Sequence, residues 1–178
     1  YIMATPEAYH SCKTYHIEPF WDDEFKSLEY HREAFNDSES VNQWINLGFG
    51  PKITGEMCDM KSAQPGWNHR FIEYFESLGW QDIGTSYYRM TSGTVLPTHS
   101  DLYRAYIKRF NLDDRKHSIK RALILLEDWQ PGHYLDCMGR AFVHWRAGDV
   151  VEWTYDTPHS AANVGFVDRY TLQITGHQ

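Results

Sequence analysis

Residues 147–165 read AGDVVEWTYDTPHSAANVG, and this stretch decides the fold that the sequence predicts. Two short extended runs, DVVEWT and HSAANV, lie on either side of the turn residues DTP at 156–158. Short runs of this kind, separated by turn residues, are typical of antiparallel sheets. The same rhythm continues on both sides of the quoted stretch.

From residue 83 onward, further runs have a similar length and are separated by turn residues. They are IGTSYYRM, TVLPTHSD, IKRALILLED, HYLDC, RAFVHW and DRYTLQIT, punctuated by Gly93, QPG at 130–132 and MG at 138–139. Eight short strands imply a sandwich or a barrel. We therefore expect a mainly β core over 83–176, interrupted by an insertion at 102–118.

Residues 1–82 are expected to form a helical or mixed support for this core, within a single domain spanning 1–178. The segment DDEFKSLEYHREAF at 22–35 places Phe25, Leu28 and Phe35 near helical spacing, with Asp22 as a cap. The segment NHRFIEYFESLGW at 68–80 predicts a clearer helix. There we expect Asn68 as the cap, Gly79 as the end, and a core-facing stripe of Phe71, Ile72, Phe75 and Leu78.

The composition limits the class of protein. Hydrophobic residues make up 42% and aromatic residues 16% of the 178 residues, which excludes a disordered chain. No run of 18 apolar residues is present, so we expect no membrane span, and no leader is visible after Tyr1. Three scattered cysteines (Cys12, Cys58, Cys137) favour a reducing, cytoplasmic location over a disulfide framework.

The formal net charge of −7 is unevenly distributed, because seven Lys and Arg residues gather in 102–121. A chain that is otherwise acidic is a poor general binder of nucleic acid, so nucleic acid is not expected as a partner. The basic segment calls for a separate explanation.

Four polar residues carry the chemistry that we expect. His99 and Asp101 are two residues apart and would point to the same side of a strand, while His159 and Arg169 follow later in the chain. Two imidazoles and one carboxylate on one face of an octahedral metal leave three positions open, as non-haem Fe(II) requires for oxygen chemistry. Zinc is usually held by a closed tetrahedral set. Arg169 could grip a carboxylate with two hydrogen bonds, and Thr171 could add a third.

The pattern HxD…H…RxT over eight short strands resembles the Fe(II)/2-oxoglutarate-dependent dioxygenases, whose fold is a double-stranded β-helix (a cupin-like jelly roll). The stretch at 147–165 is similar to the segment around the second histidine of hydroxylases of the prolyl and aspartyl/asparaginyl type. The resemblance implies that His99, Asp101 and His159 bind Fe(II) and that the enzyme uses O2. It also implies that Arg169 and Thr171 hold 2-oxoglutarate.

Three positions refine this resemblance. Many prolyl hydroxylases have a tyrosine where Leu96 stands, so another contact to the oxoacid is needed, for which Tyr88 and Arg121 are candidates. The nucleic-acid demethylases of the family usually have a second arginine where Thr175 stands, and the halogenases lack the carboxylate that Asp101 provides. The resemblance therefore favours a hydroxylase.

The substrate side is open. In the segment 102–118, Tyr103, Tyr106, Ile107 and Phe110 fit one helical face, and Arg104 and Lys108 fit the other. Such a helix is either a plain surface helix or a basic lid that attracts an anionic small molecule or peptide. Asn163 either contacts the substrate or pairs with the backbone.

Two other functions remain as alternatives. One is a cupin-type metalloenzyme that does not use 2-oxoglutarate, although such proteins typically show HxH and a glutamate, and no HxH occurs in the chain. The other is a non-catalytic jelly roll that binds a ligand, which would leave the His/Asp/His set unexplained.

Overall fold

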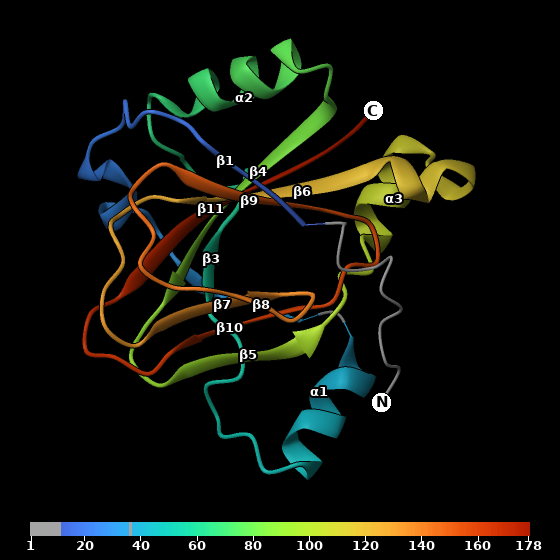
Figure 1. Ribbon diagram of the computed structural model, residues 1–178. Coiled ribbons are helices and arrows are strands. Elements are labelled where there is room, and N and C mark those ends of the chain that lie inside the picture. Colours follow the sequence, from blue (N-terminus) through green and yellow to red (C-terminus); the bar gives the residue numbers. More distant parts are fainter. Residues whose placement is uncertain (1–11, 36) are drawn as a thin grey trace.

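In the computed structural model, which describes residues 12–35 and 37–178, the chain forms two antiparallel sheets (Figure 1). The larger sheet contains β1 (Cys12–His16), β2 (His31–Arg32), β3 (Glu56–Cys58), β4 (Gln81–Met90), β6 (Ile119–Leu125), β9 (Asp149–Thr154) and β11 (Arg169–His177), in the order β1-β9-β6-β11-β4-β3-β2. The smaller sheet contains β5 (Thr94–His99), β7 (His133–Cys137), β8 (Arg140–Phe142) and β10 (His159–Asn163), in the order β5-β10-β7-β8.

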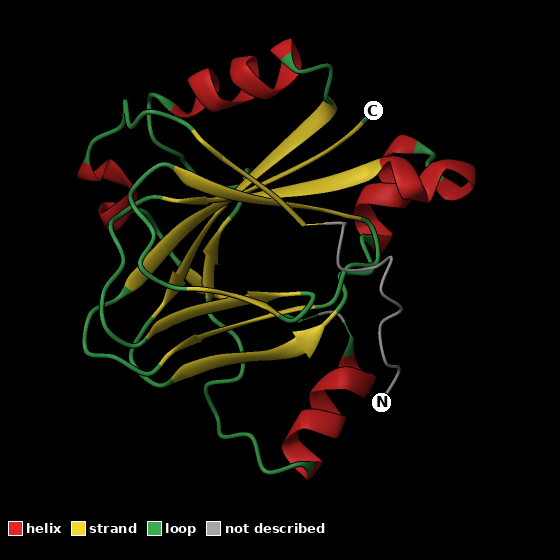
Figure 2. Cartoon of the chain, viewed as in Figure 1, coloured by secondary structure: helices red, strands yellow, loops and turns green. Residues whose placement is uncertain are grey.

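The helices lie around the two sheets (Figure 2). They are α1 (Ser38–Asn46), α2 (Asn68–Ser77) and α3 (Arg104–Phe110), with 3-10 turns at Asp23–Ser27 and Asp113–Ser118. Helix α2 covers the outer face of the larger sheet, and α1 lies next to the smaller sheet (Figure 1). Within the described ranges, no helix has the length and apolarity needed to cross a membrane.

The larger sheet is buried on both faces. On strand β6, Leu123 and Leu125 pack between the two sheets, whereas Ala122 and Ile124 pack on the other side with Phe71 of α2. This explains why the segment ALILL at 122–126 is continuously apolar instead of alternating, since a strand covered on both faces has no solvent side. The space between the sheets forms the main core, and the candidate site lies in it.

The eight predicted strands are confirmed, and their positions correspond to β4 to β11. Strands β1, β2 and β3 were not predicted, and they extend the larger sheet at its two edges. Two of them are only two or three residues long, and the outermost strands β1 and β2 have mostly exposed or half-exposed side chains. Short edge strands of this kind carry little hydrophobic pattern.

The predicted helix at 22–35 is wrong beyond its first turn. Asp22 does cap it by accepting from the backbone N–H of Glu24, but the helix is a 3-10 turn that ends at Ser27. The rings of Phe25 and Tyr30 both pack against Tyr170, with centroids 5.4 and 5.9 Å apart. The chain leaves the helical path between them and continues to β2.

Helix α2 is confirmed, but Asn68 is not its cap. Its buried side chain donates to Oγ1 of Thr85 at 3.2 Å and accepts from the Tyr87 hydroxyl at 2.7 Å, which fastens the helix to β4. Of the predicted stripe, Phe71 and Phe75 are fully buried and Leu78 is 45% exposed. The core-facing stripe is therefore narrower than the sequence predicts.

Candidate metal centre

His99, Asp101 and His159 meet at one end of the smaller sheet. His99 is the last residue of β5 and His159 is the first residue of β10, and the two are direct partners in the antiparallel pairing. Their ring centroids are 4.4 Å apart, and Asp101 follows in the loop after β5. One ligand atom from each of the three residues lies within 4.8 Å of the others, so the three could share one metal ion.

Hydrogen bonds set both imidazoles in the form that binds a metal. Nδ1 of His99 lies 2.8 Å from the carbonyl oxygen of Pro97, and Nδ1 of His159 lies 3.0 Å from that of Thr157. Because a carbonyl oxygen only accepts, each Nδ1 carries the proton and each Nε2 keeps its lone pair. Burial also lowers the pKa of His159 to about 4, so this ring is neutral at pH 7.

Asp101 is held ionised at the centre of this cluster. Its carboxylate oxygens lie 3.5 Å from Nε2 of His99 and 3.7 Å from Nε2 of His159, and Nη1 of Arg121 is 3.4 Å away. Burial by itself would raise the pKa of Asp101, but Arg121 and the two imidazoles together hold this pKa below its usual range. Oδ2 is buried and has no hydrogen-bond partner, as expected of an atom that binds a metal.

Arg169 lies between the sheets away from this cluster. It is the first residue of β11, pairs with Met90 at the end of β4, and is only 3% exposed. The side chain of Asn163, at the opposite end of β10 from His159, also bonds to the Met90 carbonyl oxygen. Arg169, on the larger sheet, therefore lies near the end of the smaller sheet that is opposite His99 and His159.

The Arg169 guanidinium lacks a counter-ion among the described residues. Nη1 donates to Sδ of Met90 at 2.9 Å, the ring of Trp145 lies 5.5 Å from its central carbon, and Nε and Nη2 are buried without a partner. Burial lowers the pKa of Arg169 to about 10, which leaves it charged at pH 7. The two unpartnered nitrogens match the two oxygens of a carboxylate.

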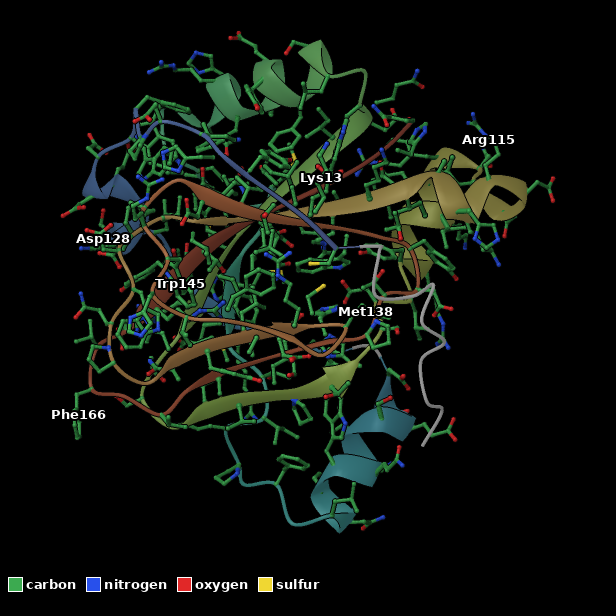
Figure 3. All side chains as sticks on the ribbon, viewed as in Figure 1. Lys13, Arg115, Asp128, Met138, Trp145 and Phe166 are labelled. Atoms are coloured by element: carbon green, nitrogen blue, oxygen red, sulfur yellow. The ribbon has the colours of Figure 1, made fainter. Side chains whose placement is uncertain are left out.

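One cavity shares the Trp145 side chain with the surroundings of Arg169, but Arg169 itself does not line it. This cavity of about 370 Å³ is lined by Leu125, Val151 and Trp145, and Trp145 lies between the sheets in Figure 3. Leu125 is the strand partner of Thr171, which is buried at 2% exposure and lies on the same strand face as Arg169. A carboxylate at Arg169 would therefore have Thr171 next to it.

Two predicted contacts to the oxoacid are placed differently. The Tyr88 hydroxyl donates to Oε2 of Glu33 at 2.8 Å and accepts from the backbone N–H of Gly55 at 2.6 Å, so it is already occupied. Arg121 lies next to Asp101 rather than Arg169, and it donates to Oε1 of Gln173 at 2.7 Å. Within the protein, Tyr88 therefore connects Glu33 and Gly55 to β4.

The structure places the three predicted substrate contacts in different surroundings. The Asn163 amide donates to the carbonyl oxygens of Met90 and Val167 and accepts from the backbone N–H of Gly165, which makes its role structural. Arg104 and Lys108 both belong to α3, but only Arg104 lines the cavity next to Asp101.

The sequence did not reveal several neighbours of the His-Asp-His cluster. The ring of Trp153 lies 4.6 Å from that of His159, and its Nε1 is buried without a partner. The rings of Phe35 and Trp44 lie 5.2 and 5.9 Å from that of His99. Trp153 is six residues before His159, and its sequence context predicts only a packing role in the barrel. Nothing in the sequence around Phe35 and Trp44 indicates that these two rings lie next to His99.

Comparisons with known proteins support the fold. The sequence matches no family model and no curated protein. A prolyl-4-hydroxylase from Pseudomonas putida is similar in structure over 88% of this chain and 96% of its own, with a TM-score of 0.53 and 17% identity.

A second solved structure is the non-heme alpha ketoglutarate dependent carbocyclase SnoK from nogalamycin biosynthesis. It is similar over 98% of this chain and 84% of its own, with a TM-score of 0.53 and 12% identity. A predicted oxalate decarboxylase from Thermotoga maritima also matches, at a TM-score of 0.45, with 11% identity over 86% of this chain and 96% of its own. Identities this low show the fold alone, and the chain is a double-stranded β-helix protein.

Proposed function

We propose that this protein is an Fe(II)- and 2-oxoglutarate-dependent oxygenase. Its reaction would be hydroxylation of an amino-acid residue, prolyl or aspartyl/asparaginyl, or of a free amino acid. The observation that carries the proposal is Arg169, a buried guanidinium with two unpartnered nitrogens in the same barrel as the His-Asp-His cluster. A carboxylate ligand would supply the counter-ion that this guanidinium lacks among the described residues.

The ligand set fits Fe(II). His99 and His159 would each offer Nε2, and Asp101 would offer Oδ2, which has no hydrogen-bond partner. Three protein ligands leave the remaining positions of an octahedral ion open for a co-substrate and O2. When bound, Fe(II) and 2-oxoglutarate supply the oxidising chemistry, in which O2 is consumed, 2-oxoglutarate becomes succinate and CO2, and one oxygen atom enters a C–H bond of the substrate.

The other residues would bind and orient. Arg169 would hold the distal carboxylate of 2-oxoglutarate through Nε and Nη2, with Thr171 beside it, and the Trp145 ring would keep water from the guanidinium. Arg121 would act as a positioning residue, because its ion pair with Asp101 fixes the orientation of that carboxylate.

Metal binding is the first half of the test. Purified without oxygen, the protein should bind one Fe(II), and His99→Ala, Asp101→Ala and His159→Ala should each weaken binding sharply. Loss of one ligand of three removes a direct metal bond, which the remaining ligands cannot replace. Metal analysis after anaerobic dialysis measures this, and full iron content in the triple variant would place the metal elsewhere.

Co-substrate binding is the second half. Arg169→Lys should weaken 2-oxoglutarate binding to the iron-loaded protein by about 2–5 kcal/mol, because a lysine cannot form two parallel hydrogen bonds with a carboxylate. Anaerobic equilibrium dialysis measures the affinity, and iron content should stay unchanged. Unchanged 2-oxoglutarate affinity in Arg169→Lys would refute the proposal. If the affinity falls as expected, a substrate screen that follows succinate formation identifies the substrate class.

A further inference from the structure

Two of the three cysteines, far apart in the sequence, come together between the two sheets. Cys12 is the first residue of β1 in the larger sheet, and Cys137 is the last residue of β7 in the smaller sheet. Cys137 is fully buried in the core between the sheets, and Cys12, which is half-buried, packs against the same core. Both thiols are free. The fold therefore forms a pair from cysteines that are scattered in the sequence.

The pairing of the strands explains how the two cysteines meet. Cys12 is the partner of Trp153 on β9. Cys137 is the partner of His159 on β10. Directly opposed residues of antiparallel strands point to the same face, with their Cβ atoms about 5 Å apart. Because the Trp153 and His159 rings meet between the sheets, with centroids 4.6 Å apart, the cysteine beside each ring is brought close to the other cysteine.

The two thiols interact directly, and the interaction makes them unequal. A hydrogen bond from the Cys137 thiol, together with the charge of Arg140, lowers the pKa of Cys12 in spite of burial. The same hydrogen bond raises the pKa of Cys137. Cys12 is therefore the thiol that ionises first, and it is also the more accessible of the two. A partly exposed cysteine near a cation, with a second thiol beside it, is typical of redox-sensitive pairs.

Cys58 has none of these features. It belongs to the other core, between the larger sheet and α2, and it is fully buried there. Its thiol donates to the carbonyl oxygen of Ala63 at 3.6 Å, and burial raises its pKa. The chain therefore contains its own control, a cysteine that should stay reduced under conditions that oxidise the pair.

We propose that Cys12 and Cys137 are an oxidation site, in which a peroxide converts the two thiols into a disulfide between the sheets. The Cys12 sulfur attacks one oxygen of hydrogen peroxide and the O–O bond breaks. Cys12 becomes a sulfenic acid, and the released hydroxide leaves as water with the thiol proton. The Cys137 sulfur then attacks the Cys12 sulfur, the S–O bond breaks, and a second water leaves. The two thiols lose two electrons and two protons, and one hydrogen peroxide is reduced to two waters.

The disulfide links the edge of the larger sheet to the candidate metal centre. Strand β1 is at one edge of that sheet, and Cys137 is the strand partner of His159. Oxidation therefore fastens β1 to the smaller sheet beside this histidine, and a small thiol releases it again by thiol–disulfide exchange. The inference needs neither Fe(II) nor 2-oxoglutarate, so it stands or fails independently of the proposed function.

Thiol counting on the whole chain tests the proposal. The reduced protein, freed of metal with a chelator, is treated with one equivalent of hydrogen peroxide, quenched, denatured and titrated with 5,5′-dithiobis(2-nitrobenzoate). The thiol count should fall from three to one per chain, and dithiothreitol should restore it to three. Peptide mapping without reduction should find Cys12 joined to Cys137 within one chain, with Cys58 unmodified. In concentrated urea, where the pair is no longer held together, the same treatment should lose this selectivity.

Serine variants separate the two steps. Cys58→Ser should still form the disulfide, and Cys137→Ser should stop at the sulfenic acid of Cys12, which dimedone traps. Cys12→Ser should form neither product. Three free thiols in the peroxide-treated wild type, a disulfide that includes Cys58 or joins two chains, or equal dimedone labelling of Cys12 and Cys58 in Cys137→Ser would each overturn the proposal. The wild-type peptide map decides the matter even if a variant at the buried Cys137 does not fold.

Discussion

At the scale of single residues, the two buried arginines of the barrel are in opposite electrostatic situations. Arg121 has the carboxylate of Asp101 3.4 Å away, and its charged neighbours raise its pKa in spite of burial. Arg169 has no carboxylate partner among the described residues, and burial lowers its pKa to about 10. The first arginine is a structural ion pair, whereas the second carries an uncompensated charge that a ligand would neutralise.

Replacement of each arginine by methionine should therefore change stability in opposite directions. In the absence of metal and 2-oxoglutarate, Arg169→Met should be more stable than the wild type by about 1–4 kcal/mol, because a buried unpaired charge is removed. Arg121→Met should be less stable by about 3–5 kcal/mol, because Asp101 is left buried and unpaired. Urea unfolding measures both free energies.

The pH dependence of the stability difference between Arg169→Met and the wild type provides the control for this prediction. A base whose folded-state pKa lies below its unfolded value costs stability at every pH below the folded pKa, and this cost is relieved only as pH rises above it. The difference between Arg169→Met and the wild type should therefore be constant from pH 7 to about 9. A destabilised Arg169→Met protein would mean that the guanidinium has a partner in the free protein.

At the scale of elements, α2 holds the outer face of the larger sheet through a narrow contact. Phe71 and Phe75 are fully buried against Tyr87, Ile124 and Leu172, and the buried Asn68 side chain bonds to β4. The opposite side of the helix is polar or exposed. The helix is therefore held to the sheet by two phenylalanines one helical turn apart and by the Asn68 side chain.

Truncation of this contact should be costly. Phe71→Ala should lower the free energy of unfolding by about 3–5 kcal/mol, because it removes a buried ring and leaves a cavity that the sheet cannot fill. Leu78→Ala is the matched control at the helix end, where the side chain is 45% exposed, and should cost less than about 1 kcal/mol. Similar losses for both variants in urea unfolding would contradict the assigned face.

At the scale of the whole molecule, four buried or half-buried tyrosines hold strands, helices and loops together through their hydroxyl groups. The Tyr15 hydroxyl donates to Glu152, that of Tyr30 to the carbonyl oxygen of Phe25, that of Tyr87 to Asn68 and that of Tyr88 to Glu33. Burial raises the pKa of all four phenols above the usual value. These hydroxyl groups donate their hydrogen bonds only while they stay protonated.

The protein should therefore unfold cooperatively in alkali. A folded-state pKa above the unfolded value gives stability that is present below pH 10 and is lost as pH rises above it. The loss is about 1.4 kcal/mol per pH unit for each such phenol. Absorbance at 295 nm and far-UV circular dichroism, followed together, should show one shared transition above pH 10. Titration of all twelve tyrosines near pH 10 with unchanged dichroism would contradict this prediction.

The sequence by itself determined the strand pattern from β4 to β11, because short apolar runs between turn residues depend on local chemistry alone. It also predicted His99, Asp101, His159 and Arg169 as site residues through their order in the chain and a family resemblance, and the structure brings the first three together. The sequence did not predict the N-terminal strands, because they pair with sheet edges formed by distant residues. It also did not predict where the first helical turn ends, because that turn packs against the ring of Tyr170.

Only the tertiary structure decided which polar groups are occupied and which are not. Tyr88 and Asn163 have side chains suited to binding a ligand. In the structure, however, the Tyr88 hydroxyl is hydrogen-bonded to Glu33 and Gly55, and the Asn163 amide is hydrogen-bonded to the Met90 carbonyl oxygen. Arg169 and Arg121 are the same residue type, yet only one has a carboxylate partner. Partners such as these lie 20 to 73 positions away in the chain, a separation at which local sequence patterns carry no information about contact.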